Sequence, residues 1–314
     1  MQQISPFKLI PQYREYVWGG TRIRPEAERT AEAWVVYEEN RIENGPLAGK
    51  TLAEAADAFG DALLGSQVIS QTGTKFPLLI KILDAAQWLS LQVHPDNEQA
   101  RRWEGEGHFG KMEGWYVIDA DAGAQLISGF KRGVTPEAIH STIGTKSMLD
   151  LVSWKGVKSG DSVLIRPGTL HALGPGLMIY EVQQTSDVTF RVFDWDRPKK
   201  AGRDLHLEQA VDVLDPHADG KLSHSGSDFT GEKELFSCQF FKLELLSGLG
   251  SPAQRDTIGR SFQTLTVVEG DARVSGNGFQ ALLGRFETLL IPASFGKFEV
   301  ICPRGVCLAA RVPV

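Results

Sequence analysis

Cysteine is scarce in this sequence of 314 residues: there are only three, Cys238, Cys302 and Cys307. A disulfide framework or a thiolate zinc site needs cysteines in patterned pairs, and these are odd in number and widely spaced. The pattern therefore fits reduced thiols in a cytoplasmic protein better than either kind of site.

Long apolar runs and a strong basic charge are also absent. No uncharged apolar run approaches the length that crosses a bilayer, so we expect no membrane association. The N-terminal residues show neither the basic region nor the apolar core of a signal peptide, and we expect none. The formal net charge is −6, which argues against a broad nucleic-acid-binding surface. No obligate protein partner is evident. Hydrophobic residues make up 42% of the chain, which is typical of a globular protein. The length of 314 residues predicts one large domain or two.

The stretch Leu89–Asp96 combines an apolar face with a polar face. It follows an apolar run, 76–83, that is typical of a buried strand. Because side chains alternate along a strand, Ser90, Gln92 and His94 share one face, and the residues between them share the other. The pattern predicts a strand that presents a hydroxyl, an amide and an imidazole to a pocket. A histidine beside a glutamine is nevertheless more often a simple hydrogen-bonded pair than a ligand site.

Two further segments add donor side chains. A strand-like run places Lys111 and Glu113 on one face, and a Pro-Gly turn is followed by His171. Taken alone, Glu113 is a surface carboxylate paired with Lys111, and His171 is a turn histidine. With His94 they give two imidazoles and a carboxylate, which is a ligand set for a divalent transition metal. Gln92 is a candidate fourth ligand.

The chain is rich in short strand-like runs separated by turns, which predicts a mainly β protein built as a sandwich or barrel. Helical segments interrupt the strands. One covers 51–59, where Thr51 and Glu54 form a capping box, and a helical insertion is expected around 133–156.

A change in composition divides the chain. Residues 223–231 are rich in Ser, Gly and Thr, which indicates a linker. We therefore expect a metal-binding domain at 1–230 and a C-terminal β domain at 231–314. A weak internal echo relates 162–168 to 288–293, but the second copy has no histidine after its proline, so the C-terminal domain is expected to lack a metal site.

The donor segments resemble the two motifs of the cupin superfamily. More narrowly, the chain resembles the type I mannose-6-phosphate isomerase family in its short bacterial class. The matching segments span about two thirds of the chain: Trp18-Gly19-Gly20, Phe76–Leu79, Lys81–Leu83, Leu89–Asp96, Lys111-x-Glu113-x-Trp115-Tyr116, Gly168–Leu173 and Arg191-x-x-Asp194–Arg197. The resemblance implies a mainly β fold, in which a cupin-type jelly-roll barrel carries the metal site and helical insertions. A second, smaller cupin-like β domain follows it.

The resemblance also implies a function and its residues. The family interconverts mannose 6-phosphate and fructose 6-phosphate with one zinc ion per chain. The implied zinc ligands are Gln92, His94, Glu113 and His171, the implied catalytic residues are Arg191 and Lys111, and the implied substrate-binding residues are Ser90 and Lys81. Gln92 is left open, because some members use only the two histidines and the glutamate.

The chemistry of an aldose–ketose isomerase agrees with these residue types. A metal bound to the substrate oxygens stabilises the enediol, and a base must carry the proton between C1 and C2. A cation such as Arg191 or Lys111 can balance the oxyanion. The 6-phosphate needs cations or hydroxyl donors, for which Ser90, Lys81 and Lys111 are candidates. The sequence does not identify the base. The remaining histidines are read as surface residues without partners: His108, His140, His206, His217 and His224.

Other interpretations remain open at this point. Alternation places Arg191 on one face with Phe193 and Trp195, so it could be a structural arginine stacked on aromatic rings. Departures from the expected family pattern at Trp88 and Gly114 keep open a catalytically inactive, metal-holding cupin that binds a sugar phosphate in a regulatory role. A cupin oxygenase that uses iron is a third possibility.

Overall fold

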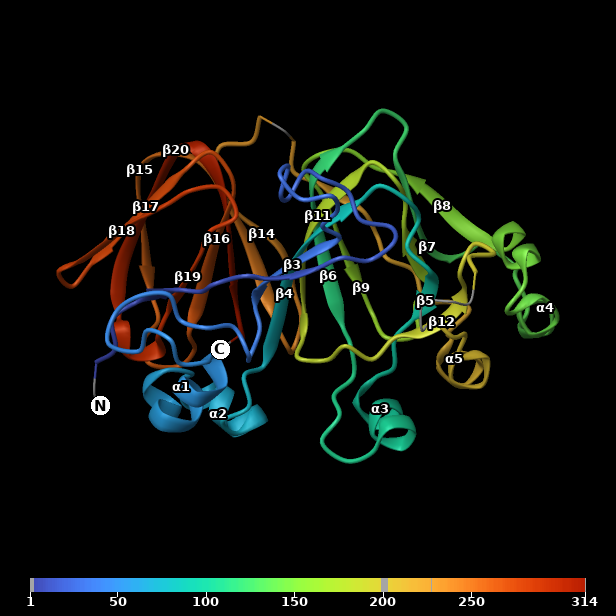
Figure 1. Ribbon diagram of the computed structural model, residues 1–314, viewed down its shortest axis with the longest axis horizontal. Coiled ribbons are helices and arrows are strands. Elements are labelled where there is room, and N and C mark those ends of the chain that lie inside the picture. Colours follow the sequence, from blue (N-terminus) through green and yellow to red (C-terminus); the bar gives the residue numbers. More distant parts are fainter. Residues whose placement is uncertain (1–2, 199–202, 227, 314) are drawn as a thin grey trace. The chain divides into compact units, whose positions relative to one another are not determined.

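The chain divides into two compact units by the packing of its backbone. The computed structural model describes residues 3–198, 203–226 and 228–313. Unit 1 comprises Met1–Tyr13, Ala33–Ile82 and Ser225–Val314, and unit 2 comprises Arg14–Glu32 and Leu83–His224. Both units consist mainly of strands, which confirms the expected fold class (Figure 1). Among the described residues, no helix has the length and apolar character needed to cross a bilayer.

The strands of unit 2 belong to two sheets. Its strands are β5 (Leu91–Val93), β6 (Glu113–Ala120), β7 (Gln125–Phe130), β8 (Val152–Gly156), β9 (Asp161–Ile165), β10 (His171–Leu173), β11 (Leu177–Gln184), β12 (Phe190–Phe193) and β13 (Ser223–His224). The chain changes unit within β2 (Gln12–Arg14), β3 (Glu32–Val36) and β4 (Leu78–Ala85). One sheet has the order β12-β5-β10-β7-β8, and the other has the order β13-β9-β6-β11-β4-β3-β2. Neighbouring strands of β5, β6 and β10 run antiparallel.

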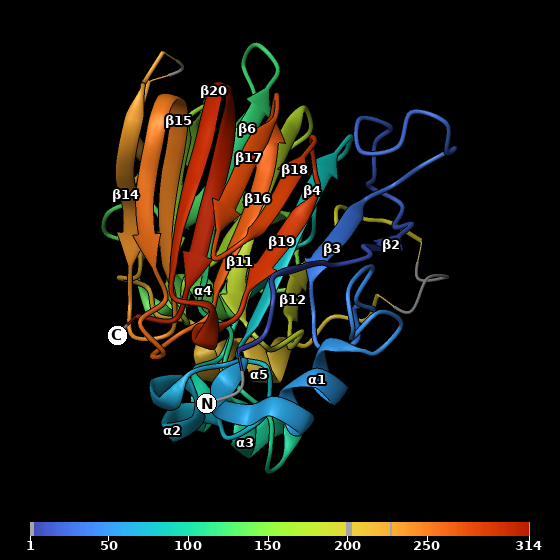
Figure 2. The same cartoon turned by 90° about the vertical axis from the view of Figure 1, so that its left-hand side faces the viewer.

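Unit 1 is organised around one antiparallel sheet. Its strands are β1 (Phe7–Lys8), β14 (Gly231–Ser237), β15 (Lys242–Asp256), β16 (Gln263–Glu269), β17 (Ala272–Gly276), β18 (Phe279–Leu283), β19 (Thr288–Ile291) and β20 (Lys297–Arg311). The order is β1-β19-β16-β20-β15-β14, and β17 pairs with both β18 and β20. Figure 2 shows these strands with the long β15 and β20 next to one another, as their pairing requires.

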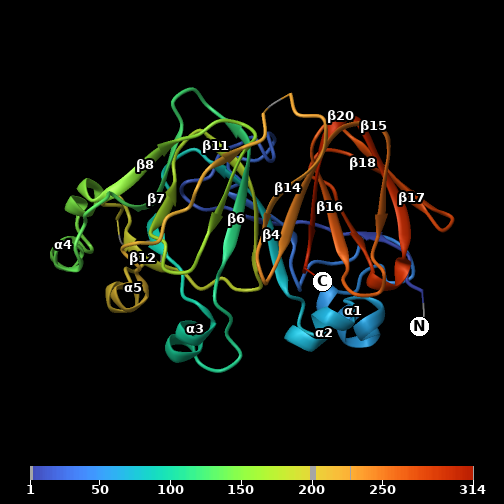
Figure 3. The same cartoon turned by 180° about the vertical axis from the view of Figure 1, so that it is seen from behind.

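The helices are short and lie at the ends of the strands. Unit 1 has α1 (Leu52–Phe59), η1 (Gly60–Ala62), α2 (Ser66–Thr72) and η4 (Ala293–Phe295), and unit 2 has α3 (Asn97–Glu104), α4 (Pro136–Thr142), η2 (Lys146–Asp150) and α5 (Leu207–Val213). The predicted capping box is confirmed: Thr51 Oγ1 accepts from Glu54 N, and Glu54 Oε2 accepts from Thr51 N. Helix α5 packs against β5 and β12, and the view from behind in Figure 3 shows it beside β12. The insertion expected around 133–156 contains α4 and η2, and it ends in strand β8.

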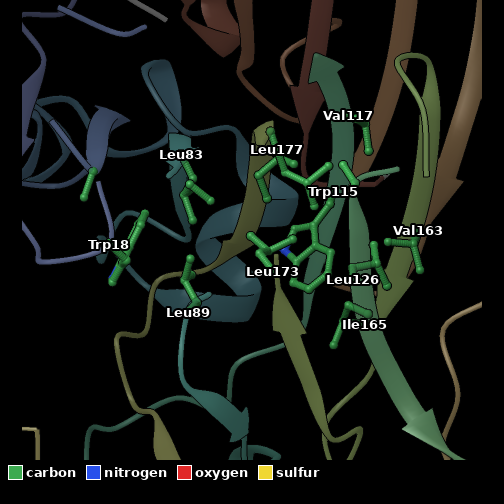
Figure 4. Close-up of a cluster of buried hydrophobic side chains, with 14 residues drawn as sticks. Trp18, Leu83, Leu89, Trp115, Val117, Leu126, Val163, Ile165, Leu173 and Leu177 are labelled. Carbon is green, nitrogen blue, oxygen red and sulfur yellow. The ribbon is translucent and has the colours of Figure 1, made fainter. Parts of the chain in front are cut away.

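The interior of unit 2 contains a large apolar cluster. Figure 4 shows the Trp115 ring among Leu126, Ile165 and Leu173, which come from different strands. All four side chains are buried. Because β6 also carries Glu113, the packing of Trp115 fixes the strand from which Glu113 projects.

The Trp18-Gly19-Gly20 segment is a point of close backbone approach in unit 2. A Cβ atom on Gly20 would lie 2.3 Å from Asp84 Oδ2, which is closer than side chains can approach. Asp84 is 1% exposed, and it accepts hydrogen bonds from the backbone N and the Nε of Arg22. The glycine therefore makes room for a buried carboxylate that is paired with Arg22.

The strand-like run 236–246 is interrupted in the structure: β14 ends at Ser237 and β15 begins at Lys242. The chain reverses between them, where Cys238 N donates to Phe241 O. The domain limits 1–230 and 231–314 stay a prediction, because backbone packing does not test which segments fold independently. That packing joins the C-terminal strands to two segments from the first 82 residues.

Candidate active site

Three strands of unit 2 bring His94, Glu113 and His171 together. His94 directly follows β5, Glu113 begins β6, and His171 begins β10. One potential ligand atom from each residue lies within 4.8 Å of the others. His94 Nε2 is 3.4 Å from Glu113 Oε2, and His171 Nε2 is 3.2 Å from Glu113 Oε1. All three side chains are at most 1% exposed.

A tight turn precedes His171 and determines its position. Pro167 and Gly168 follow β9, and Gly168 adopts a φ of 82°, which a residue with a side chain rarely adopts. The Gly168 N–H donates to the carbonyl of His94 at 2.9 Å, so the turn joins the two histidine segments directly. His171 then pairs with Gln92 across β10 and β5.

Backbone carbonyls fix the orientation of both imidazole rings. His94 Nδ1 lies 2.9 Å from Val188 O, and His171 Nδ1 lies 2.8 Å from Thr169 O. Because a carbonyl oxygen can only accept, each Nδ1 carries the hydrogen, and in the neutral ring Nε2 keeps its lone pair. Both free Nε2 atoms are the ones that approach Glu113. This is the arrangement by which outer contacts orient histidine ligands.

Burial and the neighbouring charges keep the His94 imidazole neutral and the Glu113 carboxylate ionised. Burial, together with the Lys111 ammonium, lowers the pKa of His94 to about 3. Burial alone would raise the pKa of Glu113, but the Lys111 ammonium and His94 hold that pKa well below its usual value. Lys111 Nζ lies 3.3 Å from Glu113 Oε2, and Lys111 is itself 4% exposed.

The residues fit a metal ion. His94 Nε2 and both carboxylate oxygens of Glu113 are buried atoms without a hydrogen-bond partner among the described residues. Leaving such atoms unsatisfied is costly, and a cation between them would satisfy all three. Two neutral imidazoles and one carboxylate are the donor set of catalytic zinc sites that keep an open position.

Gln92 and Ser90 lie at the edge of this group. Ser90 Oγ donates to Gln92 Oε1 at 3.2 Å, and Gln92 Nε2 lies 3.2 Å from His171 Nε2. The amide therefore turns its nitrogen, rather than its oxygen, toward the group. A half-turn of the amide would present Oε1 to the group and let Nε2 donate to Ser90 Oγ. Gln92 as a ligand stays a prediction.

Arg191 lies in the same row as Gln92. The two residues are direct partners across β12 and β5, so their side chains project from the same face of the sheet. Arg191 Nε is buried and has no hydrogen-bond partner among the described residues. Burial and the nearby Arg203 lower its pKa. The backbone N–H of Arg191 donates to His206 Nδ1 at 3.2 Å. His206 was expected to be a surface residue without a partner, and this expectation is wrong.

Lys81 is placed differently. It lies on β4 in the part assigned to unit 1, is 3% exposed, and has its ammonium group 5.1 Å from the centre of the Trp34 ring. Such a cation–π contact is attractive and favours the buried position of the ammonium group. Its role in binding substrate stays a prediction.

One residue near the group, Glu181, escaped the sequence reasoning. Glu181 Oε1 accepts a hydrogen bond from Trp115 Nε1 at 2.9 Å, and the Trp115 ring meets the His171 ring edge-on at 5.5 Å between centroids. Glu181 is 4% exposed. A carboxylate inside the otherwise apolar run of β11 was the available signal, but only the pairing of β11 with β6 shows what it faces.

The loop that carries Lys111 is also anchored. Gln184 Oε1 accepts from Met112 N at 3.0 Å, and Lys111 N donates to Pro95 O at 2.9 Å. Ser186 Oγ donates to Phe109 O at 2.7 Å. Residues 184–188 therefore anchor the backbone at Phe109 and Met112, on both sides of Lys111, and Val188 O orients the His94 ring.

Fold and site together define a mainly β protein of the cupin type with a buried His–Glu–His group. A family model described as the catalytic domain of type I phosphomannose isomerase matches residues 6–110. A mannose-6-phosphate isomerase of Streptococcus mutans is 35% identical over 94% of this chain and 95% of its own length. The chain therefore belongs to the type I mannose-6-phosphate isomerase family.

Solved structures agree with this assignment. The mannose 6-phosphate isomerase of Bacillus subtilis superimposes with a TM-score of 0.87 at 30% sequence identity, and the match covers 98% of this chain and 99% of that one. A zinc-bound mannose 6-phosphate isomerase superimposes with a TM-score of 0.76 over 98% of this chain and 99% of that one. Because its identity is 18%, that likeness shows the fold alone.

Proposed function

We propose that the protein is a zinc-dependent isomerase that interconverts mannose 6-phosphate and fructose 6-phosphate by transferring a proton between C1 and C2. The observation that carries the proposal is the buried group of His94, Glu113 and His171, whose facing atoms lack hydrogen-bond partners among the described residues. The names of the full-length relatives support the substrate, and the zinc-bound family member supports the metal.

His94, Glu113 and His171 would hold one zinc ion per chain, with Gln92 as a fourth ligand after its amide turns. When bound, the ion supplies a Lewis acid that stabilises negative charge on the substrate oxygens. The protein prepares the site in advance. Carbonyl groups hold both rings with Nε2 toward Glu113, and the depressed pKa of His94 keeps its lone pair available near neutral pH.

Lys111 and Arg191 supply positive charge. Lys111 lies beside Glu113, in a buried position where a charge acts strongly on nearby oxygens. Arg191 projects from the row that contains Gln92, and a guanidinium stays charged near neutral pH. We assign both residues to the balance of negative charge that develops on the reacting oxygens.

Ser90 and Lys81 are assigned to the substrate. With the Gln92 amide turned, Ser90 Oγ accepts from that amide and its own hydrogen is released to a substrate oxygen. Lys81 is assigned to the sugar phosphate on the resemblance of its segment to the family, since a dianionic phosphate needs cations. We expect the isomerase to act in the cytoplasm on this small-molecule substrate.

The test is a coupled isomerase assay on several sugar phosphates, with and without a chelator. We expect activity with mannose 6-phosphate that chelation abolishes and zinc restores, with one zinc per chain by metal analysis. His171→Ala should remove both activity and zinc. The exposed His140 on α4 provides the matched control, and His140→Ala should change neither. Unchanged activity in His171→Ala would contradict the proposal. Tight binding of a sugar phosphate without turnover would favour the inactive, regulatory alternative.

A further inference from the structure

Gln183 lies directly beside Glu113 and has no place in the function described so far. It is the partner of Glu113 across β11 and β6, so the two side chains project from the same face with their Cβ atoms about 5 Å apart. Gln183 is 0% exposed. On the other side of Glu113, the partner on β9 is the apolar Ile165. Gln183 is therefore the polar neighbour of the carboxylate within its sheet.

The amide of Gln183 has one satisfied end and one unsatisfied end. Its Nε2 donates to the carbonyl oxygens of Ser186 and Gln184. Two acceptors on this side fix the nitrogen there, because an oxygen in its place would face two other oxygens. Oε1 is consequently turned away from both carbonyls. It is buried and has no hydrogen-bond partner among the described residues.

An acceptor in this position requires a donor. The adjacent Glu113 carboxylate does not provide one, since Gln183 Oε1 and both carboxylate oxygens of Glu113 all lack a hydrogen-bond partner among the described residues. A buried acceptor without a donor in the protein favours a ligand that supplies a hydrogen-bond donor, because the unpaired acceptor is costly. Hydroxyl groups are the donors in which a sugar phosphate is rich.

We propose that Gln183 is a further substrate-binding residue, whose Oε1 accepts a hydrogen bond from one hydroxyl group of the sugar phosphate. The proposal rests on the function proposed above. It places the hydroxyl-binding atom on β11, opposite Glu113, while the amide nitrogen anchors the turn that leads to Val188. A purely structural role for Gln183 would need the nitrogen only, and its loss would then weaken the binding of every analogue alike.

The experiment uses a hexitol 6-phosphate, which has no carbonyl group and cannot be isomerised, together with analogues that each lack one hydroxyl. Binding to the zinc-loaded parent protein and to Gln183→Met is measured by titration calorimetry. Zinc affinity of the metal-free proteins is measured separately, by competition with a chromogenic chelator. Isomerase activity of the parent is measured in parallel.

We expect Gln183→Met to bind the hexitol phosphate roughly tenfold more weakly, the effect of losing one buried hydrogen bond. One deoxy analogue should bind parent and variant equally, because the hydroxyl that Oε1 receives is already missing. Zinc affinity should stay within about twofold, since Gln183 is not a ligand.

Equal binding of the hexitol phosphate by parent and Gln183→Met would overturn the proposal. So would an identical loss against every analogue, or a parallel loss of zinc affinity, since either result means that Gln183 acts indirectly. If Gln183→Met does not fold, Gln183→Asn withdraws the oxygen by one methylene and should show the same loss. A parent that isomerises while the variant binds normally rejects only the role of Gln183. A parent that neither binds nor isomerises rejects the proposed function as well.

Discussion

The two β units differ most in what their strands enclose. In unit 1 the buried polar side chains on the central strands, such as Thr264, Thr266 and Thr288, are small and uncharged. They accompany an apolar cluster of Leu246, Leu265, Val267, Ala272, Val274, Leu283, Leu289, Ile291, Phe295, Phe298, Val300, Cys302, Cys307 and Ala309. In unit 2 the strands enclose His94, Glu113 and His171 as well as apolar side chains. Burying unpaired polar groups costs free energy, whereas filling an interior with apolar groups lowers the free energy of the folded state. Unit 2 therefore gives up stability at the point where its chemistry is located.

The internal echo in the sequence shows how the difference arises. In unit 2, β9 ends in the Pro167–Gly168 turn, and the chain then delivers His171 to the group. In unit 1, β19 is followed by Pro292 and the short η4 helix, which buries Phe295. The same strand-proline pattern thus leads to an imidazole in one unit and to an aromatic ring in the other.

The largest effect is expected from removing the central carboxylate of unit 2. Glu113→Gln keeps the size of the side chain but removes its charge, so zinc binding should be lost and activity should fall at least ~100-fold. Metal analysis and the coupled assay measure both. Glu244→Gln in unit 1 is the matched control, because Glu244 is also a largely buried carboxylate paired with a cation. If Glu113→Gln remained active, the buried carboxylate of unit 2 would not be required for activity, and the proposed difference between the two units would be wrong.

A cavity in unit 1 should cost stability without affecting the chemistry. Leu265 is 0% exposed within the apolar cluster, so Leu265→Ala should lower the free energy of unfolding by about 2–5 kcal/mol. Urea denaturation gives this value, and kcat at a temperature where the variant remains folded should be unchanged. A loss of zinc affinity in Leu265→Ala would show that the interior of unit 1 also serves the site.

Zinc should stabilise the protein through unit 2. At a free zinc concentration of 100 times Kd, the free energy of unfolding should rise by about 2.7 kcal/mol. Calorimetric or denaturant unfolding with and without zinc measures the rise, and Glu113→Gln should show none. If the parent is not stabilised by zinc, His94, Glu113 and His171 do not bind it in the native state.

A smaller, pH-dependent effect is expected in unit 1. Arg255 lies 2.7 Å from Glu244, and although burial alone would raise the pKa of Glu244, its cationic neighbours hold that pKa below the usual 4.5. A depressed folded pKa stabilises the protein above pH 4.5, and the contribution is lost as the pH falls below that value. Denaturation of the parent should therefore show an acid-side loss of stability that is reduced in Glu244→Gln. Identical profiles for the two proteins would show that the ion pair is neutral in its effect, as many partly exposed pairs are.

Local patterns predicted much of the fold and the centre of the candidate site. Alternation along Leu89–Asp96 gave the shared face of Gln92 and His94, and Thr51 with Glu54 gave the start of α1. The reversal between β14 and β15 was missed, because residues 237–241 contain no glycine or proline to indicate a turn. These signals act over a few residues, and they succeed where a few residues decide the conformation.

Long-range pairing could not be predicted in the same way. Glu181 and Gln183 are polar residues in a strand-like run, and their relation to Trp115 and Glu113 exists only in the register of β11 on β6. The contact of His206 with the backbone of Arg191 likewise depends on how the chain returns after β12. A single sequence does not show which strands pair, and therefore does not show which of these residues lie side by side.

The route of the chain between its two units sets the order in which they can be completed during translation. Unit 2 ends at His224, so all of its segments have been synthesised when that residue is added. Unit 1 holds early segments, through Ile82, whose partner strands begin only after Ser225. The ribosome therefore supplies all parts of unit 2, which carries the candidate site, before those of unit 1, and the apolar interior of unit 1 closes only when the last strands have emerged.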